Sequence, residues 1–208
     1  GALAPPIIGL AVLHGGDFPG WTQFLFWMAL LGLSELLPIT LGMGSQVTMT
    51  VPIHLALALI YPPWVAILIT GLGALDISEF KREISVERAL YNRFQIMLAV
   101  GAIAIFFAIY RGNDFHIFRL AIAAIIHLVV NLGLVAIGVS VDEGVPFMDV
   151  LRELPPTPIT GFFVSYAAIT ALGAITAIAH SEVGDWAVAA ILIPLLFARL
   201  SFLGAKAQ

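Results

Sequence analysis

The segment 47–73 constrains this chain most, because two apolar runs meet at Pro62-Pro63 and each is too short to cross a membrane. A continuous spanning helix needs about 20 apolar residues. Interrupted segments at membrane depth occur where the irregular backbone is buried in protein or lines a polar cavity. The break therefore predicts a broken helix pair at 47–78 and a ligand site beside it.

The composition places the whole chain in a membrane. Hydrophobic residues make up 61% of the sequence and charged residues only 11%, whereas charged residues make up about a quarter of a typical soluble domain. This excludes a water-soluble globule. The net charge is −4 and no Lys/Arg-rich tract is present, so no nucleic-acid partner is expected. Cysteine is absent, which excludes disulfides and thiolate metal sites.

The predicted fold class is an all-α integral membrane bundle of about six to eight transmembrane segments. Turn residues separate the apolar pieces, which lie near 2–14, 20–37, 47–60, 63–78, 89–110, 115–140, 158–180 and 184–204. An alternative counts 47–78 as one re-entrant hairpin in a six-span protein. Because the chain opens at Gly1 without a methionine, we expect one transmembrane domain, 1–208, that is a piece of a longer polypeptide.

Basic residues predict the orientation. Lys81, Arg82 and Arg88 share one short loop, and Arg199 and Lys206 lie near the carboxyl end. Short loops rich in Lys and Arg stay in the cytoplasm. Counting back through alternating spans places both termini and the connection 141–157 inside. The expected location is therefore a bacterial inner membrane, crossed several times.

The connection 141–157 carries its own pattern. Apolar residues recur there at helical spacing, with Asp149, Arg152 and Glu153 between them. Such a pattern predicts a short amphipathic helix in the inner interface.

Four polar residues inside apolar segments are candidates for a ligand site: Glu35, His54, His127 and Asn131. Ionisable groups in hydrocarbon cost several kcal/mol unless they have partners, which makes such residues functional candidates by default. His127 and Asn131 are four residues apart, so a helix places them on one face.

Residues 46–54 extend this candidate wall. Gln46, Thr48, Thr50 and His54 alternate with apolar residues, and a period of two predicts an extended segment with one polar edge. Pro52 disfavours a helix there. Pro62-Pro63 then predicts a helix start, whose free amide groups suit an anionic or carbonyl ligand atom.

A simpler interpretation is that these polar residues only hydrogen-bond one helix to another. No hydrolase, metalloprotease, P-loop or dinucleotide motif occurs, so we expect no enzymatic activity and identify no cofactor. The five histidines form no spaced metal motif, although His54 and His127 could bind a metal if they met in space. Small residues such as Gly71 and Gly73 predict a close helix contact.

The run 89–105, which begins AlaLeuTyrAsnArgPheGln, resembles an Ala-Leu-Phe-Asn-x-x-Gln segment in the amino-terminal membrane sensor regions of bacterial HD-domain phosphohydrolases and GGDEF diguanylate cyclases. The broken pair at 47–73 and the helix at 193–203 also resemble those regions. Asn92 and Gln95 are the most specific residues of the resemblance, and they complete the ligand-binding candidates. The layout is also similar to the S components of energy-coupling-factor vitamin transporters.

The resemblance implies a membrane-embedded sensory domain. A small ligand would bind in an intramembrane pocket, and the last helix would carry the signal to a cytoplasmic output domain on the same polypeptide, with cyclic dinucleotide signalling as its context. The expected partners are the lipid bilayer, the ligand, that output domain and a second copy in a homodimer. The alternative is a substrate-binding S component of a vitamin or metal uptake transporter.

Overall fold

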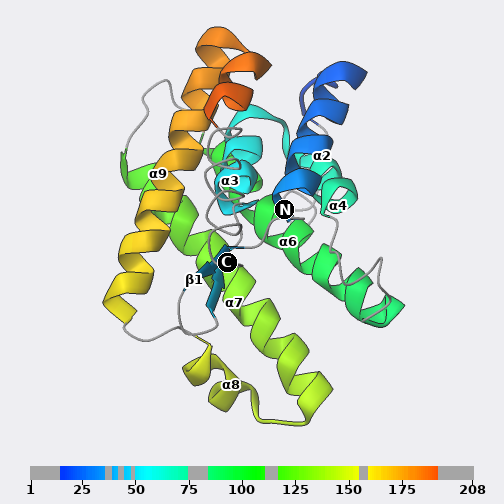
Figure 1. The fold of residues 1–208 in the computed structure, drawn as a ribbon, viewed down its shortest axis with the longest axis vertical. Helices are drawn as coiled ribbons and strands as arrows, with labels where there is room; N and C mark the ends of the chain where they lie inside the picture. Colours follow the sequence, from blue (N-terminus) through cyan, green and yellow to red (C-terminus); the bar gives the residue numbers. More distant parts are fainter. Residues whose placement is uncertain are drawn as a thin grey trace, which may run out of the picture.

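The computed structural model describes residues 15–35, 39–41, 45–47, 50–74, 84–110, 117–154 and 159–191. Nearly all of them are helical (Figure 1). The helices are α2 Trp21–Glu35, α3 Thr50–Ile60, α4 Pro63–Gly73, α6 Val86–Ile109, α7 Ile117–Glu143, α8 Phe147–Glu153 and α9 Ile159–Val183. Residues 185–191 are helical again. The expected segment 2–14 and the end of the last helix, with Pro194 and Arg199, lie outside the described residues.

The predicted all-α membrane bundle is confirmed in its main feature. Helices α6, α7 and α9 are long and apolar enough to cross a membrane, and α3 and α4 are shorter apolar helices. The prediction did not include one small element, an antiparallel pair of three-residue strands, β1 Ile39–Leu41 and β2 Ser45–Val47. Thr40 lies opposite Gln46 in this pair.

The broken pair forms as two separate helices. Helix α3 ends at Ile60, and Pro62 caps α4, which begins at Pro63. Proline suits the first position of a helix because its fixed φ is helical and its missing N–H had no intrahelical partner to lose. Pro62-Pro63 therefore does start a helix, as the sequence predicts.

The extended conformation predicted for residues 46–54 is wrong for residues 50–54. Gln46 is in strand β2, but Thr50 through His54 form the first turn of α3. Pro52 is the third residue of that helix. The first four N–H groups of a helix have no intrahelical acceptor, so a proline there removes no hydrogen bond. Thr48 lies outside the described residues.

Helix α3 occupies the middle of the bundle, with α9 on one side and α4 on the other, and it also contacts α6 (Figure 1). Glycines permit two of the closest approaches. A Cβ on Gly173 of α9 would lie 2.7 Å from the Pro52 carbonyl oxygen, and one on Gly73 of α4 would lie 3.1 Å from the Met28 carbonyl oxygen. The backbones of α9 and α3, and of α4 and α2, therefore meet almost directly.

Helix α8 follows α7 after the turn at Gly144, whose φ is +68°. It confirms a short helix in the connection 141–157, although it spans only Phe147–Glu153. Val150 is buried, and Arg152 lies 3.7 Å from Asp149 on the exposed side. Its placement in the inner membrane interface stays a prediction.

Candidate functional site

A cavity of about 740 Å³ opens where four helices end. The carboxyl ends of α2, α4 and α7 and the first turns of α6 surround it. Three of the predicted site residues, Glu35, Asn92 and Gln95, line this cavity, and His54 and His127 do not. The cavity therefore lies at the end of the bundle that carries Arg88 and Arg93, not beside the histidines.

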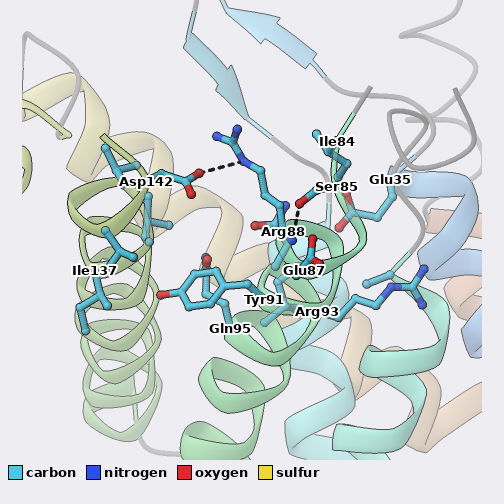
Figure 2. Close-up of a pocket in the computed structure, with 17 residues that line it drawn as sticks. Glu35, Ile84, Ser85, Glu87, Arg88, Tyr91, Arg93, Gln95, Ile137 and Asp142 are labelled. Carbon is cyan, nitrogen blue, oxygen red and sulfur yellow. Dashed lines mark hydrogen bonds and ion pairs between the residues drawn. The ribbon is translucent and has the colours of Figure 1, made fainter. Parts of the chain in front are cut away.

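The cavity wall carries charges of both signs. Arg88 and Arg93 come from α6, and Glu35, Glu87 and Asp142 supply carboxylates. Figure 2 shows Arg88 and Tyr91 directed toward α7, whereas Arg93 points to the opposite side, on which Glu35 lies. Arg88 Nε is 3.5 Å from Asp142 Oδ2 (Figure 2), and both side chains are more than half exposed. An exposed ion pair contributes about 0–1 kcal/mol, so a ligand can replace it at small cost.

Helix α6 begins next to this wall because Ser85 caps it. The Ser85 hydroxyl accepts a hydrogen bond from the backbone N–H of Arg88 at 3.3 Å (Figure 2). This is the usual role of a serine cap, which satisfies one of the first free amides of a helix. The cap fixes the start of α6, and with it the positions of Arg88 and Tyr91.

Tyr91 joins the cavity to the interior of the bundle. Its hydroxyl donates to the Leu134 carbonyl oxygen of α7, 2.5 Å away. The ring fits because residue 138 is glycine: a Cβ there would lie 2.7 Å from Tyr91 Cε1. One turn farther along α6, Gln95 Nε2 donates to Asn131 Oδ1 of α7 at 3.0 Å. Asn131 thus pairs with Gln95, and Gln95 also faces the cavity.

His127 lies deeper along the same face of α7, and His54 of α3 lies next to it. His127 Nδ1 is 2.6 Å from the Tyr166 hydroxyl of α9. The rings of His54 and His127 have centroids 6.0 Å apart, and both residues are buried. His54 therefore lies near the face that carries His127 and Asn131, from a different helix. Whether these residues bind a ligand stays a prediction.

These contacts form one polar seam, defined by five positions of α7: His127, Asn131, Leu134, Gly138 and Asp142. Their spacing of three and four residues keeps them on one side of the helix. Each contacts a polar or aromatic side chain of α6, α9 or α3. The seam runs without interruption from the cavity to the buried histidines.

Sequence reasoning missed the two tyrosines of the seam, Tyr91 and Tyr166. It ranked ionisable and amide side chains in apolar helices and passed over phenols. The signal that identified the other polar residues also applies to tyrosine, because a Tyr hydroxyl inside an apolar run needs a hydrogen-bond partner when buried. Of the remaining candidates, Thr50 is buried at the start of α3 and does not line the cavity, and Gln46 is in strand β2.

A separate polar cluster lies at the other end of α9. His180 Nε2 is 3.2 Å from Asp185 Oδ1, and Gly184, with φ of +86°, turns the chain between them. The His180 ring contacts Trp27 of α2 and Tyr61 at the break between α3 and α4, with centroids 5.8 and 6.0 Å away. This cluster closes the bundle where the two short helices meet.

In the part of the chain that the structure describes, no three His, Asp or Glu side chains are grouped as metal ligands. The sequence model of the MASE9 family matches residues 14–204 of the chain. MASE domains are membrane-associated sensor domains of signalling proteins. No curated protein matches the chain. No solved structure matches it either.

Proposed function

The chain belongs to the MASE9 family of membrane-associated sensor domains, and on this premise we propose that it binds a small polar ligand in the cavity and passes the signal to a cytoplasmic output domain. The output domain would follow on the same polypeptide. In this proposal the domain crosses the bacterial inner membrane several times with both termini inside, and it has no catalytic activity of its own.

The observation that carries the proposal is the position of the cavity at one end of the polar seam. Arg88 and Gln95 line the cavity and also contact α7. A ligand that pairs with either side chain competes with the contact to α7. Any such ligand has a different affinity for two arrangements of α6 and α7, which is what a signal requires.

The lining indicates the chemistry of the ligand. Guanidinium groups bind carboxylates and phosphates through two parallel hydrogen bonds, and Arg88 and Arg93 offer two of them. The carboxylates of Glu35 and Asp142 favour a cationic or hydrogen-donating group on the same molecule. We therefore propose a small ligand with groups of both kinds.

The same residues support the proposed orientation. The cavity contains Arg88 and Arg93, and the helix that follows the same end of α7 contains Arg152. Basic residues at helix ends favour the cytoplasmic side. In this orientation the cavity opens toward the cytoplasm, and Trp27, Tyr61 and His180 lie toward the outside.

The test uses two glycines of α7. A diguanylate cyclase is fused after Gln208, and its activity is measured in membranes for Gly138→Ala and Gly133→Ala. A Cβ at 138 collides with Tyr91, whereas one at 133 meets no atom within 4 Å. We expect a several-fold change of cyclase activity in Gly138→Ala and none in Gly133→Ala. Equal activity in both variants would contradict coupling through the seam.

The ligand is then sought with the same fusion. Fractions of a cell extract are added to membranes, and an active fraction must lose its effect in Arg88→Gln. A control variant, Arg152→Gln, changes a basic residue on α8 that does not line the cavity and should respond normally. If no fraction changes the cyclase, but cells that contain the domain and a partner ATPase accumulate a solute, the domain is a transport subunit instead.

A further inference from the structure

His54 and His127 form a pair that the proposed cavity does not use. They come from α3 and α7, their exposed fractions are 3% and 5%, and neither lines the cavity. His54 Nε2 is buried and has no hydrogen-bond partner among the described residues. An unpaired polar atom in an apolar interior is costly. Such an atom needs an explanation, and an ion bound between the two rings supplies one.

The separation of the rings fits one shared ion. A nitrogen–metal bond of about 2 Å puts an imidazole centroid roughly 3 Å from the metal, so two histidines on one ion have centroids roughly 5 to 6.4 Å apart. The observed 6.0 Å lies in the upper part of that range. When a nitrogen of each ring is directed at the ion, this separation corresponds to a wide nitrogen–metal–nitrogen angle, as in two-coordinate sites rather than tetrahedral ones.

Tyr166 holds His127 in a suitable state. Its oxygen is 2.6 Å from Nδ1 of His127. When Nδ1 carries the proton and donates it to that oxygen, Nε2 keeps a free lone pair. Metal-binding histidines almost always donate their second N–H in this way, which fixes the tautomer and the ring orientation.

We propose that His54 and His127 bind one monovalent copper ion inside the membrane. Imidazole is a good ligand for copper. Zinc sites use at least three protein ligands, and the described residues contain no group of three. Among the described residues no carboxylate joins the pair, so a divalent ion would bring two uncompensated charges into an apolar interior, where burying charge is most costly. A monovalent ion with two neutral ligands minimises that cost.

Such an ion would tie together two parts of the bundle. Helix α3 packs mainly on α9 and α6, and α7 packs mainly on α6. Copper between His54 and His127 would join α3 directly to the polar seam. This site is independent of the cavity, so its test can succeed or fail whatever the fate of the proposed ligand.

The test is a titration of the purified domain in nanodiscs, without a histidine tag and with a reductant under argon. Bound Cu(I) is measured by competition with the chromophoric chelator bicinchoninate. We expect one equivalent in the wild type and at least a hundred-fold weaker binding in His54→Asn and in His127→Asn. The matched control is His180→Asn, whose histidine pairs with Asp185 and should leave binding unchanged.

Tyr166→Phe keeps both histidines and removes only the partner of His127. Loss of such a partner lowers metal affinity about 10–100-fold, and that reduction is the expected result. This variant and the wild-type titration keep the test decisive if a histidine variant does not fold. Copper-edge X-ray absorption of the wild type should show two nitrogen neighbours.

Three binding results would overturn the proposal. They are a wild type that binds no Cu(I), binding that survives in the double variant of His54 and His127, and zinc binding of equal affinity at the same two histidines. An absorption spectrum with four nitrogen neighbours would also exclude a two-coordinate site.

Discussion

Helices α3 and α7 are both strongly apolar, yet they occupy different surroundings. Eight of the eleven residues of α3 are buried, from Thr50 to Ala58. Only three of the twenty-seven residues of α7 are buried: Ala123, His127 and Ala136. Apolar character alone therefore does not tell a central helix from a peripheral one in this protein.

The bilayer explains the difference. A long helix satisfies its backbone internally and can face lipid, so α7 exposes Ile122, Ile125 and Val129. A short helix that ends at membrane depth has free backbone groups at its ends, and these must be enclosed by protein. Helix α3 ends at the break after Ile60 and packs against the longer helices α9 and α6.

The two helices also use polar residues differently. In the apolar middle of α7 the polar residues His127 and Asn131 lie on one side and belong to the seam, because the surface that faces lipid must stay apolar. On α3 the buried polar residues Thr50 and His54 are four residues apart and meet protein on all sides. A polar residue in the apolar middle of α7 therefore indicates the direction of the seam, whereas one on α3 indicates only burial.

The largest expected loss of stability is at a buried leucine, and an exposed leucine is its control. Leu57 of α3 is fully buried and Leu98 of α6 is exposed. Leu57→Ala leaves a cavity between helices, and we expect a loss of about 2 kcal/mol, the low end for buried Leu→Ala, because lipid replaces water around the unfolded helices. Leu98→Ala should change stability by less than about 0.5 kcal/mol. The folding free energy is measured by detergent titration in mixed micelles.

Equal losses of folding free energy in Leu57→Ala and Leu98→Ala would contradict the distinction between central and peripheral helices. They would mean that α3 is no better enclosed than the outer face of α6.

An intermediate effect is expected at the contact of α9 with α3. Gly173→Ala forces a Cβ to within 2.7 Å of the Pro52 carbonyl oxygen, and we expect a loss of about 1 kcal/mol, because overpacking exceeds the gain in helix propensity. Gly133→Ala on α7 meets no atom within 4 Å. It should be neutral or slightly stabilising in the same titration. A stabilised Gly173→Ala variant would show that the two backbones are not in close contact.

The smallest effect concerns the seam itself. A double-mutant cycle of Gln95→Ala and Asn131→Ala measures the coupling of their hydrogen bond, whose length is 3.0 Å. Hydrogen bonds between membrane helices contribute about 0.6 kcal/mol on average, and that coupling is the expected value. A coupling of zero would mean that this pair does not stabilise the contact of α6 with α7. The hydrogen bond of Tyr91 to Leu134 would then be the polar contact to test next.

The sequence predicted much of the fold. The apolar runs located α2, α3, α4, α6, α7 and α9, because length and hydrophobicity suffice to identify membrane helices. Pro62-Pro63 identified the break and the start of α4. The same proline argument was wrong at Pro52, since a proline that stops a helix in its interior is tolerated in its first turn. Only the position of the helix start distinguishes the two cases.

The candidate site was harder to predict from the sequence than the fold. The sequence identified Glu35, Asn92 and Gln95, which line the cavity, and His54 and His127, which do not. His54 and His127 were placed beside one pocket because each is a costly polar group in an apolar segment, whereas Asn92 and Gln95 came from the family resemblance. Local sequence determines that such a group needs a partner.

The tertiary structure decides which partner a buried polar group contacts. The spacing of His127 and Asn131 put both on one face of α7, as predicted, yet His127 pairs with Tyr166 of α9 and Asn131 pairs with Gln95 of α6. Neighbouring residues on one face can contact different helices, because a seam between three helices changes partner within one turn. The sequence by itself determined membrane insertion, the helices and their break; the packing of α6, α7 and α9 decided where the polar groups meet, because those contacts join residues far apart in the chain.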